Sequence, residues 1–211
     1  KEIAKASKNK KIIVNKSTVP IGTGDIVEKI LKKLNKRKFD IISNPEFLRE
    51  GEAIRDFRYP DRIVIGSNNK RAFKIMKALY APLINKGAKF FTTSRRGAEL
   101  IKYASNAFLA TKITFINELA NLCEATGVNV EDVSLGMGLD NRIGSRFLRA
   151  GPAYGGSCFP KDTKGLISLA DKHKTSLSVV KSVIKSNQNR VMLLTKRIHK
   201  IIGPRIKNKK I

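Results

Sequence analysis

The chain has 211 residues, an apolar fraction of 41 % and a formal net charge of +26 at pH 7. An apolar fraction of this size excludes wholesale disorder, and no apolar run is long enough for a membrane span. The positive charge indicates a Lys-rich solvated surface. Trp is absent and aromatic residues make up only 7 %, so side chains on which bases could stack are scarce, and nucleic acid is not expected as the main partner.

The first 93 residues alternate short apolar strands with amphipathic helices. Strands are expected at 11–15, 39–43, 62–66 and 89–93, and helices at 25–34, with Asp25 as the N-cap, and at 70–83. Strands that alternate with helices predict an α/β fold with a parallel, doubly wound sheet.

The pattern becomes helical after residue 94. From residue 95 to 126 there is no Pro, Gly97 is the only glycine, and an apolar stripe predicts one long helix that ends at Gly127. Shorter helices are expected at 130–135, 162–173 and 176–202, around a Gly-rich stretch at 136–156. The predicted organisation is an α/β part at 1–93, a helical domain at 94–203 and a basic tail at 204–211.

The segment 155–162, Gly-Gly-Ser-Cys-Phe-Pro-Lys-Asp, carries the clearest chemical signal. Cys158 lies just before a helix whose first turn suits Pro160, and Lys161 follows. A thiol near a helix N-terminus and a lysine is partly thiolate near neutrality, which is the form that attacks a carbonyl. A small cysteine buried in a Gly-rich turn is the alternative, but the clustering of Gly, Lys and Asp favours a nucleophile.

The other cysteine has the opposite interpretation. Cys123 continues the apolar stripe of the long helix, three and four residues after Ala120 and Leu119, so it is expected in the core. Two such cysteines make no disulfide framework, and without a secretory signal a cytoplasmic location is expected.

Two further pairs of polar residues are candidates for the same chemistry. Glu46 and Glu50 follow a strand, where ligands bind in open α/β sheets, and would face one way in a helical turn. Lys102 and Asn106 are four apart on the long helix, where they could stabilise an oxyanion. Each pair is also compatible with a solvated surface.

The turn at residues 22–27, Gly-Thr-Gly-Asp-Ile-Val, begins like a dinucleotide fingerprint. However, Val27 stands where the third glycine is required, and no convincing acidic residue follows about twenty positions later. This turn is therefore rejected as a pyrophosphate loop.

Taken together, these segments resemble the UDP-glucose/GDP-mannose dehydrogenase family. The resemblance covers nearly the whole chain and rests on five segments in the family's order and spacing, at residues 17–20, 44–51, 61–66, 136–144 and 155–162. Within the family, Ser-Cys-Phe-Pro-Lys-Asp looks like the branch that oxidises UDP-glucose. GDP-mannose or another nucleotide-sugar remains the alternative substrate.

The resemblance implies a Rossmann-like NAD-binding part and an enzyme that oxidises a nucleotide-sugar alcohol to a carboxylate. Cys158 is implied as the nucleophile and Glu46 as the acid/base residue of thioester hydrolysis. Lys102 and Asn106 are implied to stabilise the oxyanion, and Asp162 to assist Lys102 and the water. No metal is expected.

The family pattern also implies binding residues and a homodimer through the long helix 95–126, with Arg142 reaching into the neighbouring subunit. The implied NAD contacts are Thr18, Glu50 and Lys161. The implied nucleotide-sugar contacts are Glu46, Phe47, Leu48, Arg49, Glu50, Lys102, Asn106, Arg142, Phe147, Leu148, Arg149, Ala150, Gly151 and Gly155.

The chain departs from the family pattern in three places. The N-terminal strand with its Gly-rich loop and the C-terminal UDP-binding domain are both missing, so we expect a fragment that alone binds NAD poorly and is inactive. Ala153 stands where glycine is usual and would crowd the sugar loop if that position needs positive φ. A non-catalytic, truncated remnant is the alternative interpretation.

Overall fold

The computed structural model describes residues 2–7, 9–34 and 39–203, so the expected tail at 204–211 lies outside the described residues. The chain forms two compact units, residues 1–104 and 105–211, which divide inside the long helix rather than at residue 94. Within the described ranges, no helix is long and apolar enough to cross a membrane.

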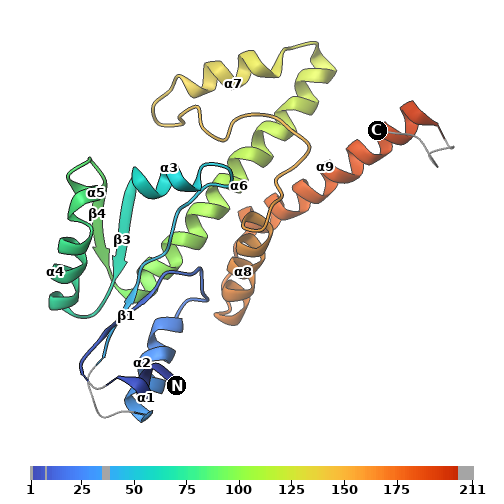
Figure 1. The fold of residues 1–211 in the computed structure, drawn as a ribbon. Helices are drawn as coiled ribbons and strands as arrows, with labels where there is room; N and C mark the ends of the chain where they lie inside the picture. The colour runs from blue at the N-terminus through green and yellow to red at the C-terminus, as the bar shows by residue number, and fades with distance from the viewer. Residues whose placement is uncertain (1, 8, 35–38, 204–211) are drawn as a thin grey trace. The chain divides into compact units, whose positions relative to one another are not determined.

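Unit 1 (residues 1–104) is an α/β layer structure built on a four-stranded sheet with the order β1-β2-β3-β4 (Figure 1). Its elements in chain order are α1 (Glu2–Ala6), β1 (Ile12–Asn15), α2 (Thr23–Leu34), β2 (Asp40–Ser43), α3 (Ala53–Arg58), β3 (Arg62–Gly66), α4 (Lys70–Leu79), α5 (Ala81–Ile84) and β4 (Lys89–Thr93), followed by the start of α6 (Arg95–Thr126).

The expectation of a wholly parallel sheet is wrong at its centre. The pairs β1–β2 and β3–β4 are parallel, but β2 meets β3 antiparallel through the single pair Ser43–Gly66. A parallel neighbour requires a crossover connection that packs on the sheet. The only described helix between these strands, α3, has six residues and no buried side chain, so it does not serve as one.

Helices cover both faces of the sheet because adjacent strand residues point to opposite sides. Ile42 packs in a cluster with Ile65 and with Met76 of α4. Its neighbour Ile41 packs with Leu31 of α2 on the other face. Each of these large side chains stabilises the fold by roughly 1.5–3 kcal/mol through burial, which fixes the strand ends that carry the polar candidates.

Several helix boundaries differ from those expected. Helix α2 begins at Thr23, so Asp25 lies in its first turn and is not its N-cap. The expected helix at 70–83 is two helices, α4 and α5, separated at Tyr80. The sequence pattern did not predict the short helices α1 and α3.

Helices are the regular secondary structure of unit 2 (residues 105–211) within its described part, as expected, and a long loop joins α7 to α8. It contains the rest of α6, then α7 (Val130–Gly138), α8 (Phe159–Lys172) and α9 (Ser178–Ile202). Its core includes Ala110, Tyr154 and Val183, with Phe159 packed against them. Cys123 is buried, which confirms the core interpretation of that cysteine.

Candidate functional site

Unit 1 has a small cavity where β1 and β2 end. Ligands in open α/β sheets bind beyond the carboxyl ends of strands, so this cavity is a candidate binding site. Thr18 and Lys102, two of the predicted site residues, both contribute to its wall. The lining residues are Asn15, Ser17, Thr18, Val19, Ser43, Pro45, Glu99 and Lys102.

Glu99, which the sequence patterns did not single out, is a polar residue of this cavity that accepts several hydrogen bonds. Its carboxylate accepts hydrogen bonds from Gly22 N at 2.6 Å, Gly24 N at 2.9 Å and Ser43 Oγ at 2.9 Å. The side chain is only 3 % exposed. An internal carboxylate thus occupies the amides at the start of α2, in agreement with the rejection of this turn as a pyrophosphate loop.

An ionic network next to Glu99 fixes the start of α6. Arg95 donates to Asp25 Oδ1 at 2.6 Å and to Glu28 Oε2 at 2.6 Å. The hydrogen bond from Arg95 lowers the pKa of Asp25, and hydrogen bonds from Lys32 and Arg95 lower the pKa of Glu28. Both carboxylates are therefore held in the charged form, as is Arg95, whose pKa these partners raise despite burial.

The structure brings together the predicted pair Lys102 and Glu46. Lys102 is 3 % exposed and its Nζ lies 3.4 Å from Glu46 Oε1. Glu46 Oε2 accepts a hydrogen bond from Leu48 N at 2.6 Å. The Phe47 ring lies 5.4 Å from Lys102 Nζ and 4.1 Å from the Arg62 guanidinium, so two cations approach one ring.

The segment after β2 is irregular, so the helical turn that would align Glu46 with Glu50 is absent and Glu50 is exposed. The Arg49 guanidinium is held by Asp56, with Nε 2.9 Å from Oδ2.

Just before Glu46, the buried Asn44 donates to Val64 O at 3.0 Å and accepts from Tyr80 OH. This anchor was missed because its partners are distant in sequence.

In unit 2, Cys158 is an exposed free thiol at the N-cap of α8. Helix α8 begins at Phe159, three residues before the predicted start, so the sulfur is closer to the helix N-terminus than expected. The Ser157 Oγ lies 3.6 Å from the Cys158 Sγ. An accessible sulfur at this position can reach an electrophile.

Asp162 and Asn106 form the second predicted pair that the structure brings together. Asn106 Nδ2 donates to Asp162 Oδ2 at 2.6 Å, and Asp162 is 1 % exposed. The other oxygen, Oδ1, lacks a hydrogen-bond partner among the described residues, although Lys161 Nζ lies 3.1 Å away. Asp162 is one turn after Cys158, whose carbonyl accepts from Asp162 N at 2.9 Å.

The predicted sugar contacts at residues 147–151 and 155 lie in the loop 147–155, between α7 and α8. Phe147 has φ +66°, a strained value for a non-glycine residue, and its ring packs edge-on against Phe159. Leu148 is 1 % exposed, so its side chain belongs to the core, whereas Arg149 and Gly155 are exposed. Ala153 does not adopt positive φ, so the anticipated crowding does not arise from the backbone conformation.

The remaining predicted site residues lie in unit 2. Ala150 and Gly151 are half-buried in the loop, and Lys161 is exposed. Arg142 is highly exposed and pairs with Asp140 at 2.6 Å.

Comparison with known proteins adds independent findings. Residues 1–84 match the NAD binding domain of the UDP-glucose/GDP-mannose dehydrogenase family, and residues 96–189 match the central domain of the same family. The chain is 52 % identical to a UDP-glucose 6-dehydrogenase of Rhizobium meliloti, over 100 % of this chain and 49 % of that protein. It is 47 % identical to UDP-glucose 6-dehydrogenase TuaD of Bacillus subtilis, over 92 % of this chain and 42 % of that protein.

Solved structures give the same picture. A UDP-glucose dehydrogenase from Pyrobaculum islandicum matches with a TM-score of 0.87 and 39 % identity, covering 93 % of this chain and 45 % of that one. The GDP-mannose dehydrogenase from Pseudomonas aeruginosa matches with a TM-score of 0.62 and 32 % identity, covering 92 % and 46 %. The chain therefore spans about half the length of the relatives that it matches.

Proposed function

This chain belongs to the UDP-glucose/GDP-mannose dehydrogenase family, and from that premise we propose that it carries the cysteine chemistry of a UDP-glucose 6-dehydrogenase. The overall reaction is the NAD-dependent, four-electron oxidation of UDP-glucose to UDP-glucuronate. Because the relatives are about twice as long, the proposed activity is that of a longer protein in which these residues take part.

The observation that carries the proposal is the exposed Cys158 thiol at the start of α8, one turn before the buried Asp162–Asn106 pair. A structural cysteine would be packed among apolar side chains, as Cys123 is. A helix N-terminus next to an accessible sulfur suits a nucleophile, and a rigid amide nearby suits a group that receives negative charge.

The proposed reaction combines two oxidations with a covalent intermediate on Cys158. Oxidation of the C6 alcohol gives an aldehyde, and the Cys158 sulfur adds to its carbonyl carbon to form a thiohemiacetal. A second two-electron oxidation gives a thioester, and attack by water breaks the C–S bond, releasing the carboxylate and the thiol. NAD, when bound, supplies the oxidising power of both oxidation steps.

The side chains around these steps have separate roles in the proposal. The Lys102 ammonium and the Asn106 amide stabilise the negative oxygen that forms when sulfur or water adds to the carbonyl. Glu46, paired with Lys102, takes the proton from the attacking water, and Asp162 holds the Asn106 amide in place and assists the water.

The residues present fit one edge of an NAD site. The cavity at the ends of β1 and β2 presents Thr18 beside Lys102, which suits the nicotinamide end of a dinucleotide. The Gly22 and Gly24 amides are occupied by Glu99, so this turn does not supply the pyrophosphate grip. We assign Thr18, Glu50 and Lys161 as the NAD contacts of this chain.

The nucleotide-sugar contacts are proposed to come from residues 46–50 and from residues 147–151, whose irregular backbone offers amides and carbonyls to hydroxyl groups. Lys102, Asn106 and Gly155 complete the set. Arg142 is free of the core and highly exposed, which suits the proposed contact with a second subunit.

We also propose a homodimer through α6. Phe108, Phe115 and Leu122 recur every seven residues on this helix and are 66 %, 47 % and 58 % exposed. A seven-residue apolar repeat on one helix is self-complementary, so a second copy of the same helix suits it. Light scattering should give a dimer mass for the chain and a monomer mass for Phe115→Glu; an unchanged dimer would contradict this interface.

The test of the proposed chemistry is Cys158→Ser in the chain fused to the remaining length of the Rhizobium meliloti relative. We expect carboxylate production to fall by about three orders of magnitude or more, as is typical when a nucleophile is removed. Unchanged turnover would contradict the thioester route. Cys123→Ser is the matched control and should keep its turnover, and parallel assays with GDP-mannose decide between the two sugars.

A further inference from the structure

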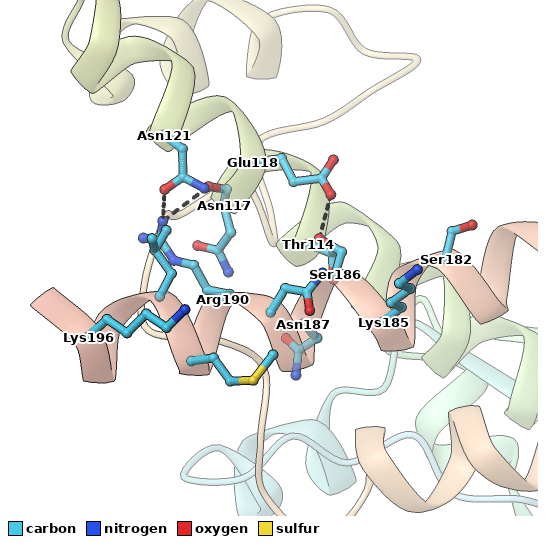
Figure 2. A pocket seen from close by; sticks show the side chains of 13 residues that line it. Thr114, Asn117, Glu118, Asn121, Ser182, Lys185, Ser186, Asn187, Arg190 and Lys196 are labelled. Carbon is cyan, nitrogen blue, oxygen red and sulfur yellow. Dashed lines mark hydrogen bonds between the residues drawn. The ribbon is translucent and has the colours of Figure 1, made fainter.

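Polar side chains of α6 and α9 hold the backbone of the loop 147–155 through hydrogen bonds. A groove of about 580 Å³ opens between these two helices, and its walls include Asn117 of α6 and Asn187 and Arg190 of α9 (Figure 2). These three side chains also hydrogen-bond to the backbone of the loop, which the chemistry described above leaves unexplained.

The first grip is on Tyr154. Tyr154 N donates to Asn187 Oδ1 at 2.8 Å, and Asn187 Nδ2 donates to Tyr154 O at 3.0 Å. One side-chain amide therefore satisfies both backbone groups of a buried residue, as a neighbouring strand would. The amide has an acceptor on one side and a donor on the other, which a carboxylate cannot reproduce.

The second grip is on Gly151. Gly151 N donates to Asn117 Oδ1 at 2.7 Å, and Gly151 O accepts from Arg190 Nε at 3.2 Å. Arg190 reaches α6 as well, donating to Asn117 O and to Asn121 Oδ1 (Figure 2). Burial lowers the pKa of the Arg190 guanidinium, and nearby Arg197 adds to this lowering, so its position is maintained at an electrostatic cost.

Asn117 holds the loop through its side-chain oxygen. It is 2 % exposed, and its Nδ2 has no hydrogen-bond partner among the residues that the structure describes. A buried donor without a partner costs roughly 1–3 kcal/mol, which an apolar residue would avoid. The side chain is therefore explained by what its Oδ1 does, which is to hold the Gly151 amide.

The held loop is also packed against the residue that follows Cys158. The Tyr154 ring packs edge-on against Phe159 at 6.1 Å, and Phe159 is the residue after Cys158. Fixing the backbone at Gly151 and Tyr154 therefore fixes both the loop and the packing at the start of α8.

We propose that Asn187, Asn117 and Arg190 are positioning residues that clamp the 151–154 backbone, so that the loop meets the sugar of the nucleotide-sugar in one conformation. The part that concerns the sugar rests on the proposed function. The clamp itself concerns only hydrogen bonds within unit 2. A positioning role of this kind acts on substrate affinity and orientation without contact with the reacting atoms.

The clamp is tested first in the chain itself, by hydrogen exchange of single backbone amides. In Asn187→Ala the Tyr154 amide loses its acceptor and should exchange at least about tenfold faster. In Asn187→Asp an acceptor remains, so that amide should stay protected, although the bond to Tyr154 O is lost. Equal exchange in the parent and Asn187→Ala would overturn the clamp.

A matched control is available two residues further along α9. Asn189 lines the same groove, is exposed and makes no hydrogen bond to the loop within the described residues. Asn189→Ala makes the same truncation at another residue of the groove and should leave both the Tyr154 and Gly151 amides as protected as in the parent. Faster exchange in this control would show that the effect does not depend on the hydrogen bonds of Asn187, and would overturn the clamp.

The positioning role is tested in the fusion with the Rhizobium meliloti relative. Asn187→Asp should raise KM for UDP-glucose about tenfold and change KM for NAD less than twofold, which general destabilisation would not do. Equal effects on both KM values, or none, would overturn the positioning role. If the unsubstituted fusion oxidises no nucleotide-sugar, the proposed function fails, whereas the exchange measurement still decides the clamp.

Discussion

The two units hold their candidate residues in different ways. In unit 1 the fixing groups are charged and buried: Glu99 on the Gly22 and Gly24 amides, Arg95 between Asp25 and Glu28, and Lys102 beside Glu46. In unit 2 they are largely neutral amides, such as Asn187 on Tyr154 and Asn106 on Asp162. The stability of unit 1 should therefore respond to pH and salt, and that of unit 2 mainly to the loss of specific hydrogen bonds.

The largest effect is expected from Glu99→Ala. Removing this buried carboxylate leaves the Gly22 and Gly24 amides and the Ser43 hydroxyl without their acceptor, which should lower the free energy of unfolding by about 3 kcal/mol. This loss is measured by unfolding in urea, monitored through the exchange of the backbone amides of Ile42 in unit 1 and Val183 in unit 2. The loss should appear at Ile42.

Glu99→Gln is the control for this substitution because it keeps the shape and one acceptor oxygen. Its loss should be clearly smaller than that of Glu99→Ala. If both variants retain the parental stability at Ile42, the carboxylate does not hold the turn, and the contrast between the units disappears.

The neutral counterpart in unit 2 is Asn117→Ala. It removes the acceptor of the Gly151 amide but also an unpartnered donor, so we expect a smaller loss of about 1–2 kcal/mol. Because no charge is removed, the loss should be the same at about 0.05 M and about 0.5 M NaCl. A loss that falls steeply with salt would show that charge matters in this unit too.

The smallest effect is the pH dependence of unit 1. The pKa values of Asp25 and Glu28 are lowered below 3.8 and 4.5, first by hydrogen bonds from Arg95 and Lys32 respectively. The folded state thus binds fewer protons than the unfolded state. This stabilisation is fully present above the usual values and is lost as the pH falls through the lowered ones.

The corresponding variant is Asp25→Asn, which should reduce the loss of stability at Ile42 between about pH 5 and about pH 2 by roughly 1 kcal/mol. Val183 in unit 2 should show no difference between the variant and the parent. An acid response at Ile42 that is the same in both proteins would exclude the Arg95 network as its source.

Much of the fold could be predicted from local patterns. The long helix followed from a 32-residue stretch without Pro in which Gly97 is the only glycine, and α6 has the expected bounds. The strands at 62–66 and 89–93 were also predicted with the correct limits. The antiparallel meeting of β2 and β3 could not be predicted, because it depends on α3 failing to cover the sheet and not on the strands themselves.

The candidate site was predictable where its residues are close in sequence or carry a distinctive motif. Cys158 followed from its glycines and its helix start, and the Lys102–Glu46 and Asn106–Asp162 contacts follow residues that the resemblance had singled out. Glu99 and Asn187 were missed because their partners are the backbone groups of residues 77 and 33 positions away. Backbone partners leave no signature in side-chain patterns.

The central claim is that Cys158 forms a covalent bond to the oxidised sugar. The most direct measurement is the intact mass of a Glu46→Gln variant of the fusion, mixed with UDP-glucose and NAD and quenched in acid, because this change should slow hydrolysis of the thioester. We expect a mass increase of one UDP-glucuronyl group, mapped by peptide analysis to Cys158 and not to Cys123. Turnover in the unsubstituted fusion, with no adduct on Cys158 at any time in either protein, would contradict it.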